Sequence, residues 1–122
     1  MEDRDPLTER IIASCYRVHN VLEPGFNEKI YHNALMLDFN QEELKYETEK
    51  RFEVYYLNNN VGKLIIDLVV ESKVIVEVKA ITGNIPDTFK YQVLSYLRVS
   101  NLKVGLLVNF GNKSCLVKRL VF

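Results

Sequence analysis

The chain has 122 residues, enough for one domain with a single core but not for a second. Sixteen basic and sixteen acidic residues give no net charge, which excludes general electrostatic attraction to nucleic acid, so any such contact needs a local patch. No apolar stretch reaches transmembrane length, and the first residues, Met-Glu-Asp-Arg-Asp-Pro, are charged, unlike a signal peptide; we therefore expect no membrane association and a cytoplasmic location.

A first helix is predicted over residues 6–21. Asp5 and Pro6 suit the N-cap and the first helical position, and apolar residues recur at helical spacing behind them. Pro24-Gly25 ends this segment. His19, near the helix end, gains from the helix dipole and could also face a cleft beside Gly25, so its role is left open.

A second helix is predicted from the cap residue Asn27 to about residue 43. Glu28 and Tyr31 share one of its faces, which places Glu28 in the first turn on the side expected to pack inward. Glu28 is then either a carboxylate stabilised by the helix N-terminus or an acidic group aimed at a site on the following strands. His32 lies on the adjacent face and is expected to be solvated.

Three antiparallel strands follow. Residues 45–57 form the first, Asn58-Asn59-Asn60 supplies turn chemistry, and two apolar runs around residues 64–70 and 74–80 form the others. A three-residue loop at 71–73 fixes the register of the last two strands.

That register sets Asp67 directly opposite Glu77. Paired residues have Cβ atoms roughly 4.5–5.5 Å apart, and two carboxylates there are unfavourable unless a cation lies between them. Mg²⁺, which takes oxygen ligands and keeps several waters, suits such a pair. Lys79 shares the face of Glu77 and could orient a metal-bound water or stabilise an oxyanion. The alternative is a structural salt bridge between Lys79 and either acid.

A third helix is predicted over residues 87–100, with Gln92 and Tyr96 spaced four apart on it. Two short strands, at 104–108 and 115–121, complete the order ααβββαββ. The last strand is apolar enough to pair with another chain at a sheet edge, so a homodimer is a further expectation.

One segment, Gly25-Phe-Asn-Glu28-Lys-Ile-Tyr31, matches a Gly-x-x-Glu-x-x-Tyr signature. From about residue 7 to residue 121 the chain resembles the GxxExxY proteins of the PD-(D/E)xK nuclease superfamily. The resemblance implies an α/β (α+β) fold with a restriction-endonuclease-like αβββαβ core, in which a mixed sheet is flanked by helices. The predicted order contains that core.

The resemblance also implies a set of metal ligands. Asp67 and Glu77 match the superfamily's two acidic ligands, and the Val78 carbonyl is a further ligand. Glu28 resembles a helical acid that exonuclease-like branches add to the metal shell.

The other implied site residues are Lys79, Gln92 and Tyr96. Lys79 looks like the residue that positions the attacking water and screens the phosphate, and the other two resemble a Gln-x-x-x-Tyr element flanking the site. The chain has Ile66 where the superfamily often has proline. It has Phe89 where related sequences favour histidine.

Together these features predict a nuclease dependent on Mg²⁺ or Mn²⁺ that hydrolyses phosphodiester bonds in DNA or RNA, with DNA favoured. The alternative function is a non-catalytic module that keeps the fold and binds nucleic acid or protein.

Overall fold

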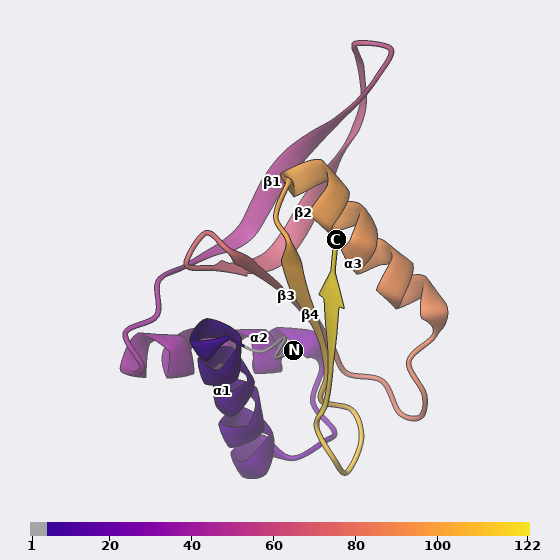
Figure 1. Ribbon diagram of the computed structural model, residues 1–122. Helices are drawn as coiled ribbons and strands as arrows, with labels where there is room; N and C mark the ends of the chain where they lie inside the picture. The colour runs from indigo at the N-terminus through magenta and orange to yellow at the C-terminus, as the bar shows by residue number, and fades with distance from the viewer. Residues whose placement is uncertain (1–4) are drawn as a thin grey trace.

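The computed structural model describes residues 5–122, and within them it has three helices and five strands in the predicted order (Figure 1). Among the described residues, none of the helices is long and apolar enough to cross a membrane. The elements are α1 (Pro6–Leu22), α2 (Glu28–Gln41), β1 (Tyr46–Tyr56), β2 (Asn59–Val70), β3 (Val74–Lys79), α3 (Asp87–Ser100), β4 (Val104–Asn109) and β5 (Leu116–Val121).

The five strands form one mixed sheet in the order β1-β2-β3-β4-β5. Strands β1 to β3 are antiparallel neighbours, β3 and β4 are parallel, and β4 and β5 are antiparallel. A parallel pair needs a crossover connection, and α3 supplies it. The predicted mixed sheet flanked by helices is confirmed.

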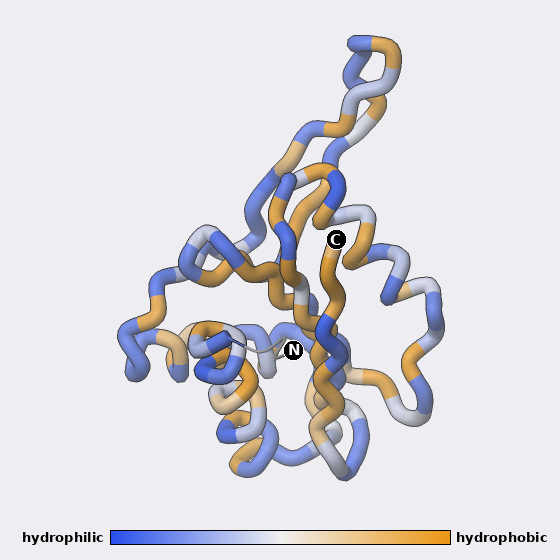
Figure 2. Tube along the Cα trace, viewed as in Figure 1, coloured by the Kyte–Doolittle hydropathy of each residue, from blue (hydrophilic) through white to orange (hydrophobic). Residues whose placement is uncertain are grey.

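The helices cover both faces of the sheet. On the face of α1 and α2, the main core contains alternate residues of β3, namely Val74, Val76 and Val78. On the face of α3, Ile75 packs in a smaller cluster with Tyr96. Figure 2 shows the central strands as largely hydrophobic, consistent with burial on both sides. This alternation follows from the period of two in a strand, and it places Glu77 and Lys79 on the α3 face with Ile75.

The β1–β2 hairpin changes face at Glu49 and Asp67. Tyr46 packs against the α1–α2 core, whereas Phe52 packs against the α3-side cluster, although simple alternation would put both on one face. The pairing of β1 with β2 skips Glu49 and Asp67, and Glu49 has a φ of 53°. A left-handed backbone is unfavourable for a residue with a side chain, so the hairpin carries local strain beside Asp67.

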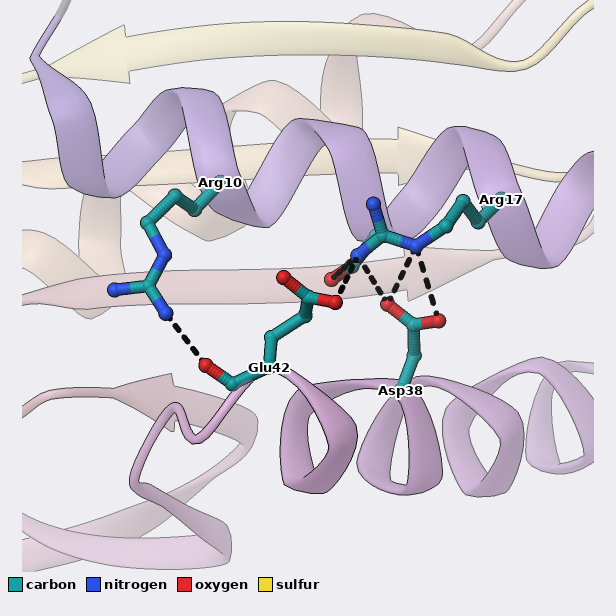
Figure 3. A network of polar contacts seen from close by, with 5 residues as sticks. Arg10, Arg17, Asp38 and Glu42 are labelled. Atoms are coloured by element: carbon teal, nitrogen blue, oxygen red, sulfur yellow. Dashed lines mark hydrogen bonds and ion pairs between the residues drawn. The ribbon is translucent and has the colours of Figure 1, made fainter.

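An ionic network fastens α1 to α2 (Figure 3). The Arg17 guanidinium lies 2.7 Å from Asp38 and 3.5 Å from Glu42, and Arg10 donates to the Glu42 carbonyl. Burial disfavours the charged form of Asp38, but hydrogen bonds from Arg17 and Ser14 outweigh it and lower its pKa. The network fixes α2, whose first turn lies beside the candidate site.

Candidate metal and active site

The candidate site begins with the hairpin of β2 and β3. Val70 pairs with Val74 and Leu68 with Val76 across the turn at residues 71–73, as predicted. The backbone pairing ends there, one step before Asp67 and Glu77. Asp67 reaches across instead, because its Oδ2 accepts a hydrogen bond from the Val78 amide at 3.1 Å. This bond holds the Asp67 carboxylate against β3.

Glu77 and Lys79 form a buried ion pair on β3. The Lys79 ammonium lies 3.1 Å from Glu77 Oε2, and the two side chains are 11% and 5% exposed. The ammonium also lies 4.2 Å from the centre of the Phe89 ring on α3. Charged side chains are rarely so buried without partners, and these partners account for the burial of Lys79.

The Glu77 carboxylate is less well compensated. Burial and the charge of Asp67 raise its pKa to about 7, and the attraction of Lys79 only partly opposes them. The proximity of the Asp67 carboxyl group contributes a further, smaller rise in this pKa. Glu77 Oε1 is buried and has no hydrogen-bond partner among the described residues. A cation between the two carboxylates would supply the missing partner and remove the repulsion, so the residues fit a divalent ion.

The Gly-x-x-Glu-x-x-Tyr segment builds the turn into α2. Gly25 has a φ of 126°, which favours glycine. The buried Tyr31 phenol donates to the Glu23 carbonyl at 2.6 Å and accepts from the Phe26 amide at 3.2 Å. Its ring stacks on Phe110 at 4.7 Å. Tyr31 therefore clamps the segment that sets where α2 begins.

Glu28 lies at the start of α2, after the Asn27 cap, and lines a cleft of about 540 Å³ together with Asp67 and Val78. The expectation that Glu28 packs inward is wrong, because its side chain is exposed. Within residues 5–122, no group of three or more His, Cys, Asp or Glu side chains is arranged to hold a metal ion. The structure thus brings Asp67 and Glu77 together but leaves Glu28 apart from them.

The cleft reaches the carboxylate pair from one side. Its lining includes Asp67 and Val78 but neither Glu77 nor Lys79, which lie under α3. Tyr96 on α3 is close enough to both acids to interact with them. Burial is the main cause that raises the pKa of Tyr96 to about 12, and the negative charges of Glu77 and Asp67 add to it. A hydrogen bond with Gln92 acts in the opposite direction.

The comparisons with known proteins agree with this fold. A sequence model described as the PD-(D/E)XK nuclease superfamily matches residues 5–120. The chain belongs to that superfamily. Of the solved structures, one described as "Crystal structure of SSO0001" is similar, with a TM-score of 0.62 and 14% identity, over 96% of this chain and 78% of that one; this likeness shows the fold alone. None of the curated proteins compared matches the chain.

In this PD-(D/E)XK chain, the sequence Glu77-Val78-Lys79 has the acid-x-lysine pattern that the superfamily's name describes, and Asp67 follows Ile66 on the neighbouring strand. The structure brings these elements together across the β2–β3 hairpin. Divalent metal ions are general in this superfamily, which fits the carboxylate pair.

His32 is a residue of this site that the sequence interpretation missed. It was expected to be solvated, but it is 5% exposed and lines the cleft. Its Nε2 lies 3.1 Å from the Asp67 carbonyl and 3.1 Å from Thr48 Oγ1. The signal was present, because His32 precedes Leu35 and Phe39 by three and seven residues and shares their buried stripe.

His19 and Asn109 have structural positions. His19 Nε2 lies 2.8 Å from the Asn112 carbonyl, and the residue is absent from the cleft lining. The fully buried Asn109 accepts from the Ile81 amide at 2.9 Å and donates to the Ile81 carbonyl at 3.0 Å. Asn109 therefore fixes the chain where it leaves β3, two residues after Lys79.

Proposed function

We propose that this PD-(D/E)XK chain is a Mg²⁺- or Mn²⁺-dependent nuclease that hydrolyses phosphodiester bonds in DNA or RNA, with DNA the favoured substrate. Membership of the GxxExxY group is part of this proposal. The observation that carries it is the buried Glu77 carboxylate, which lies beside Asp67 with one unpaired oxygen and has Lys79 at 3.1 Å.

Asp67 and Glu77 would hold the ion, with the Val78 carbonyl as a third ligand and water completing the shell. When bound, a divalent ion lowers the pKa of coordinated water and offsets charge on the phosphate. Glu28, which lines the cleft, would complete the ligand set once substrate is present. The hydrogen bond from Val78 to Asp67 keeps that carboxylate oriented in advance of binding.

Lys79 would position the attacking water and screen the phosphate. Its ammonium is close to the carboxylates yet is held by β3 and α3, so it needs little reorganisation to act. Gln92 and Tyr96 flank the acids from α3 and would contact the substrate or the water there.

The test is cleavage of single- and double-stranded DNA and RNA in Mg²⁺ and in Mn²⁺. Asp67→Ala and Lys79→Ala should abolish metal-dependent cleavage. Lys73→Ala changes an exposed lysine in the β2–β3 turn and should leave it intact. A rigorously purified wild-type protein that cleaves none of these substrates would refute the proposal.

A second candidate is a non-catalytic module that binds nucleic acid or protein. The separation of Glu28 from the carboxylate pair favours it, since no three-ligand group is assembled in the described chain. Calorimetric titration with Mg²⁺ and Mn²⁺ separates the two functions. Binding that is lost in Asp67→Ala supports the nuclease, and an absence of binding to the wild type supports the module.

A homodimer is part of the proposal as well. One copy with no net charge has little surface with which to grip a duplex. Strand β5 forms an edge of the sheet, and Leu116 and Val121 on it are exposed. Sedimentation equilibrium across a range of protein concentrations tests this, and a monomer at every concentration would contradict it.

A further inference from the structure

Lys79 has two partners of different kinds. Glu77 Oε2 accepts from its ammonium at 3.1 Å, and the Phe89 ring lies 4.2 Å away. With the side chain only 11% exposed, water supplies little solvation to the charge. Both partners therefore matter to where the ammonium lies.

These two partners respond differently to a divalent ion. A metal ion draws negative charge from a carboxylate that ligates it, so a metal-bound Glu77 attracts the Lys79 ammonium less strongly. An aromatic ring has no oxygen or nitrogen to offer a hard cation, and its face attracts an ammonium strongly when water is excluded. Phe89 is thus a partner that ion binding does not remove.

The chain between Lys79 and Phe89 is fixed in place. Asn109 bonds both the amide and the carbonyl of Ile81, and the Asn112 side chain bonds both the amide and the carbonyl of Gly83, at 2.7 and 2.8 Å. Phe89 then lies in the first turn of α3, where its amide donates to the Pro86 carbonyl at 3.1 Å. The ring is held over the ammonium by the scaffold.

We propose that Phe89 is a positioning residue that keeps the Lys79 ammonium at the site when Glu77 shares its negative charge with a divalent ion bound at its free oxygen. This inference rests on the proposed function. It assigns to Phe89 a role in placing Lys79 toward the substrate phosphate, without contact to the substrate itself.

The first test measures the contact directly by NMR. Protons above an aromatic ring are shifted upfield, so the Lys79 ε-methylene resonance should be displaced upfield in the wild-type protein with EDTA. It should stay displaced after Mg²⁺ is added. A resonance without displacement, or one that loses it on adding Mg²⁺, overturns the proposal. This result does not depend on cleavage, so it separates this inference from failure of the nuclease proposal.

The second test uses matched variants. Phe89→Leu keeps an apolar side chain without the ring, and Phe89→Tyr keeps the ring. Phe52→Leu is the control: it removes a ring that packs against the α3-side cluster and lies near Lys50 instead of Lys79. Phe89→Leu should lose the upfield displacement and lower kcat about tenfold with little change in KM. Phe89→Tyr should keep the displacement and the kcat of the wild type. Equal kcat in Phe89→Leu and the wild type, or equal losses in Phe89→Leu and Phe52→Leu, would overturn it.

Discussion

Replacing Glu77 with glutamine should stabilise the metal-free protein at neutral and alkaline pH. The substitution keeps the shape of the protonated side chain and removes the negative charge beside Asp67. Its amide nitrogen can donate where the neutral carboxyl would. The variant therefore isolates the cost of holding an ionised carboxylate at this position.

The size of the effect follows from the pKa of Glu77. Burial and Asp67 raise it from 4.5 to about 7. Each pKa unit corresponds to about 1.4 kcal/mol, so ionising Glu77 in the folded state costs up to about 3 kcal/mol of stability. The pKa of Glu77 is higher in the folded state than in the unfolded state. The stability associated with the neutral carboxyl group is therefore fully present below pH 4.5 and is lost as the pH rises through about 7.

The assay is urea unfolding of the wild type and Glu77→Gln in EDTA, across the interval from about pH 4.5 to about pH 8. The free energy of unfolding of the variant minus that of the wild type should grow with pH, by up to about 3 kcal/mol. Glu43→Gln, at an exposed glutamate after α2, is the control and should show no such growth. A difference between Glu77→Gln and the wild type that stays flat across this interval would refute the reasoning.

The same experiment with Mg²⁺ separates a metal site from a structural ion pair. A site for the ion predicts that Mg²⁺ stabilises the wild type at high pH but not Glu77→Gln, because an ion that binds only the folded state raises its stability. A purely structural pair of Lys79 and Glu77 predicts the same small response from both proteins.

Three further substitutions test the scaffold, each by urea unfolding against the wild type. Tyr31→Phe leaves the Glu23 carbonyl without its phenol partner and should cost about 1–2 kcal/mol; an unchanged midpoint would argue against the clamp. Gly111→Ala drives a methyl group into the backbone of Ile81 and should cost about 1–3 kcal/mol or more, so full stability would contradict that close approach. Glu49→Val should destabilise the protein because a β-branched side chain tolerates a left-handed backbone less well than glutamate does, whereas Glu49→Asn should cost little, and equal effects would exclude strain there.

The register of the β2–β3 hairpin could be predicted from sequence because two local rules agree on it. The turn at residues 71–73 has a fixed length, and alternation then decides which side chains meet. Asp67, Glu77 and Lys79 belong to this hairpin, so the sequence was enough to bring them together. The sequence places Phe89 on the apolar stripe of the third helix and marks it as a departure from related sequences, but it does not predict the contact with Lys79, because that contact depends on how α3 lies across the sheet.

The position of Glu28 relative to the sheet could not be predicted from the sequence. Helical periodicity gives the angle of a side chain around its axis, but not the tilt of the helix or its distance from the sheet. Periodicity therefore predicts that Glu28 packs inward, whereas its side chain is exposed and lines the cleft. His32 was expected to be solvated because it lies on the face adjacent to Tyr31, although its spacing from Leu35 places it on the buried stripe.

The change of face at Glu49 had no signal in the sequence. Left-handed positions are usually marked by glycine or asparagine, and a glutamate inside an apparent strand gives no such mark. The change depends on the twist of a long hairpin and on its packing against helices on both faces of the sheet.

Mn²⁺ titration followed by amide NMR tests most directly whether Asp67 and Glu77 hold a divalent ion. The paramagnetic ion should broaden the Val78 amide, which donates to Asp67 at 3.1 Å, before amides far from the site, such as those of α1. The broadening should disappear in Asp67→Asn. A Val78 amide that stays sharp in the wild type, or one that broadens equally in Asp67→Asn, would contradict a metal site between these two carboxylates.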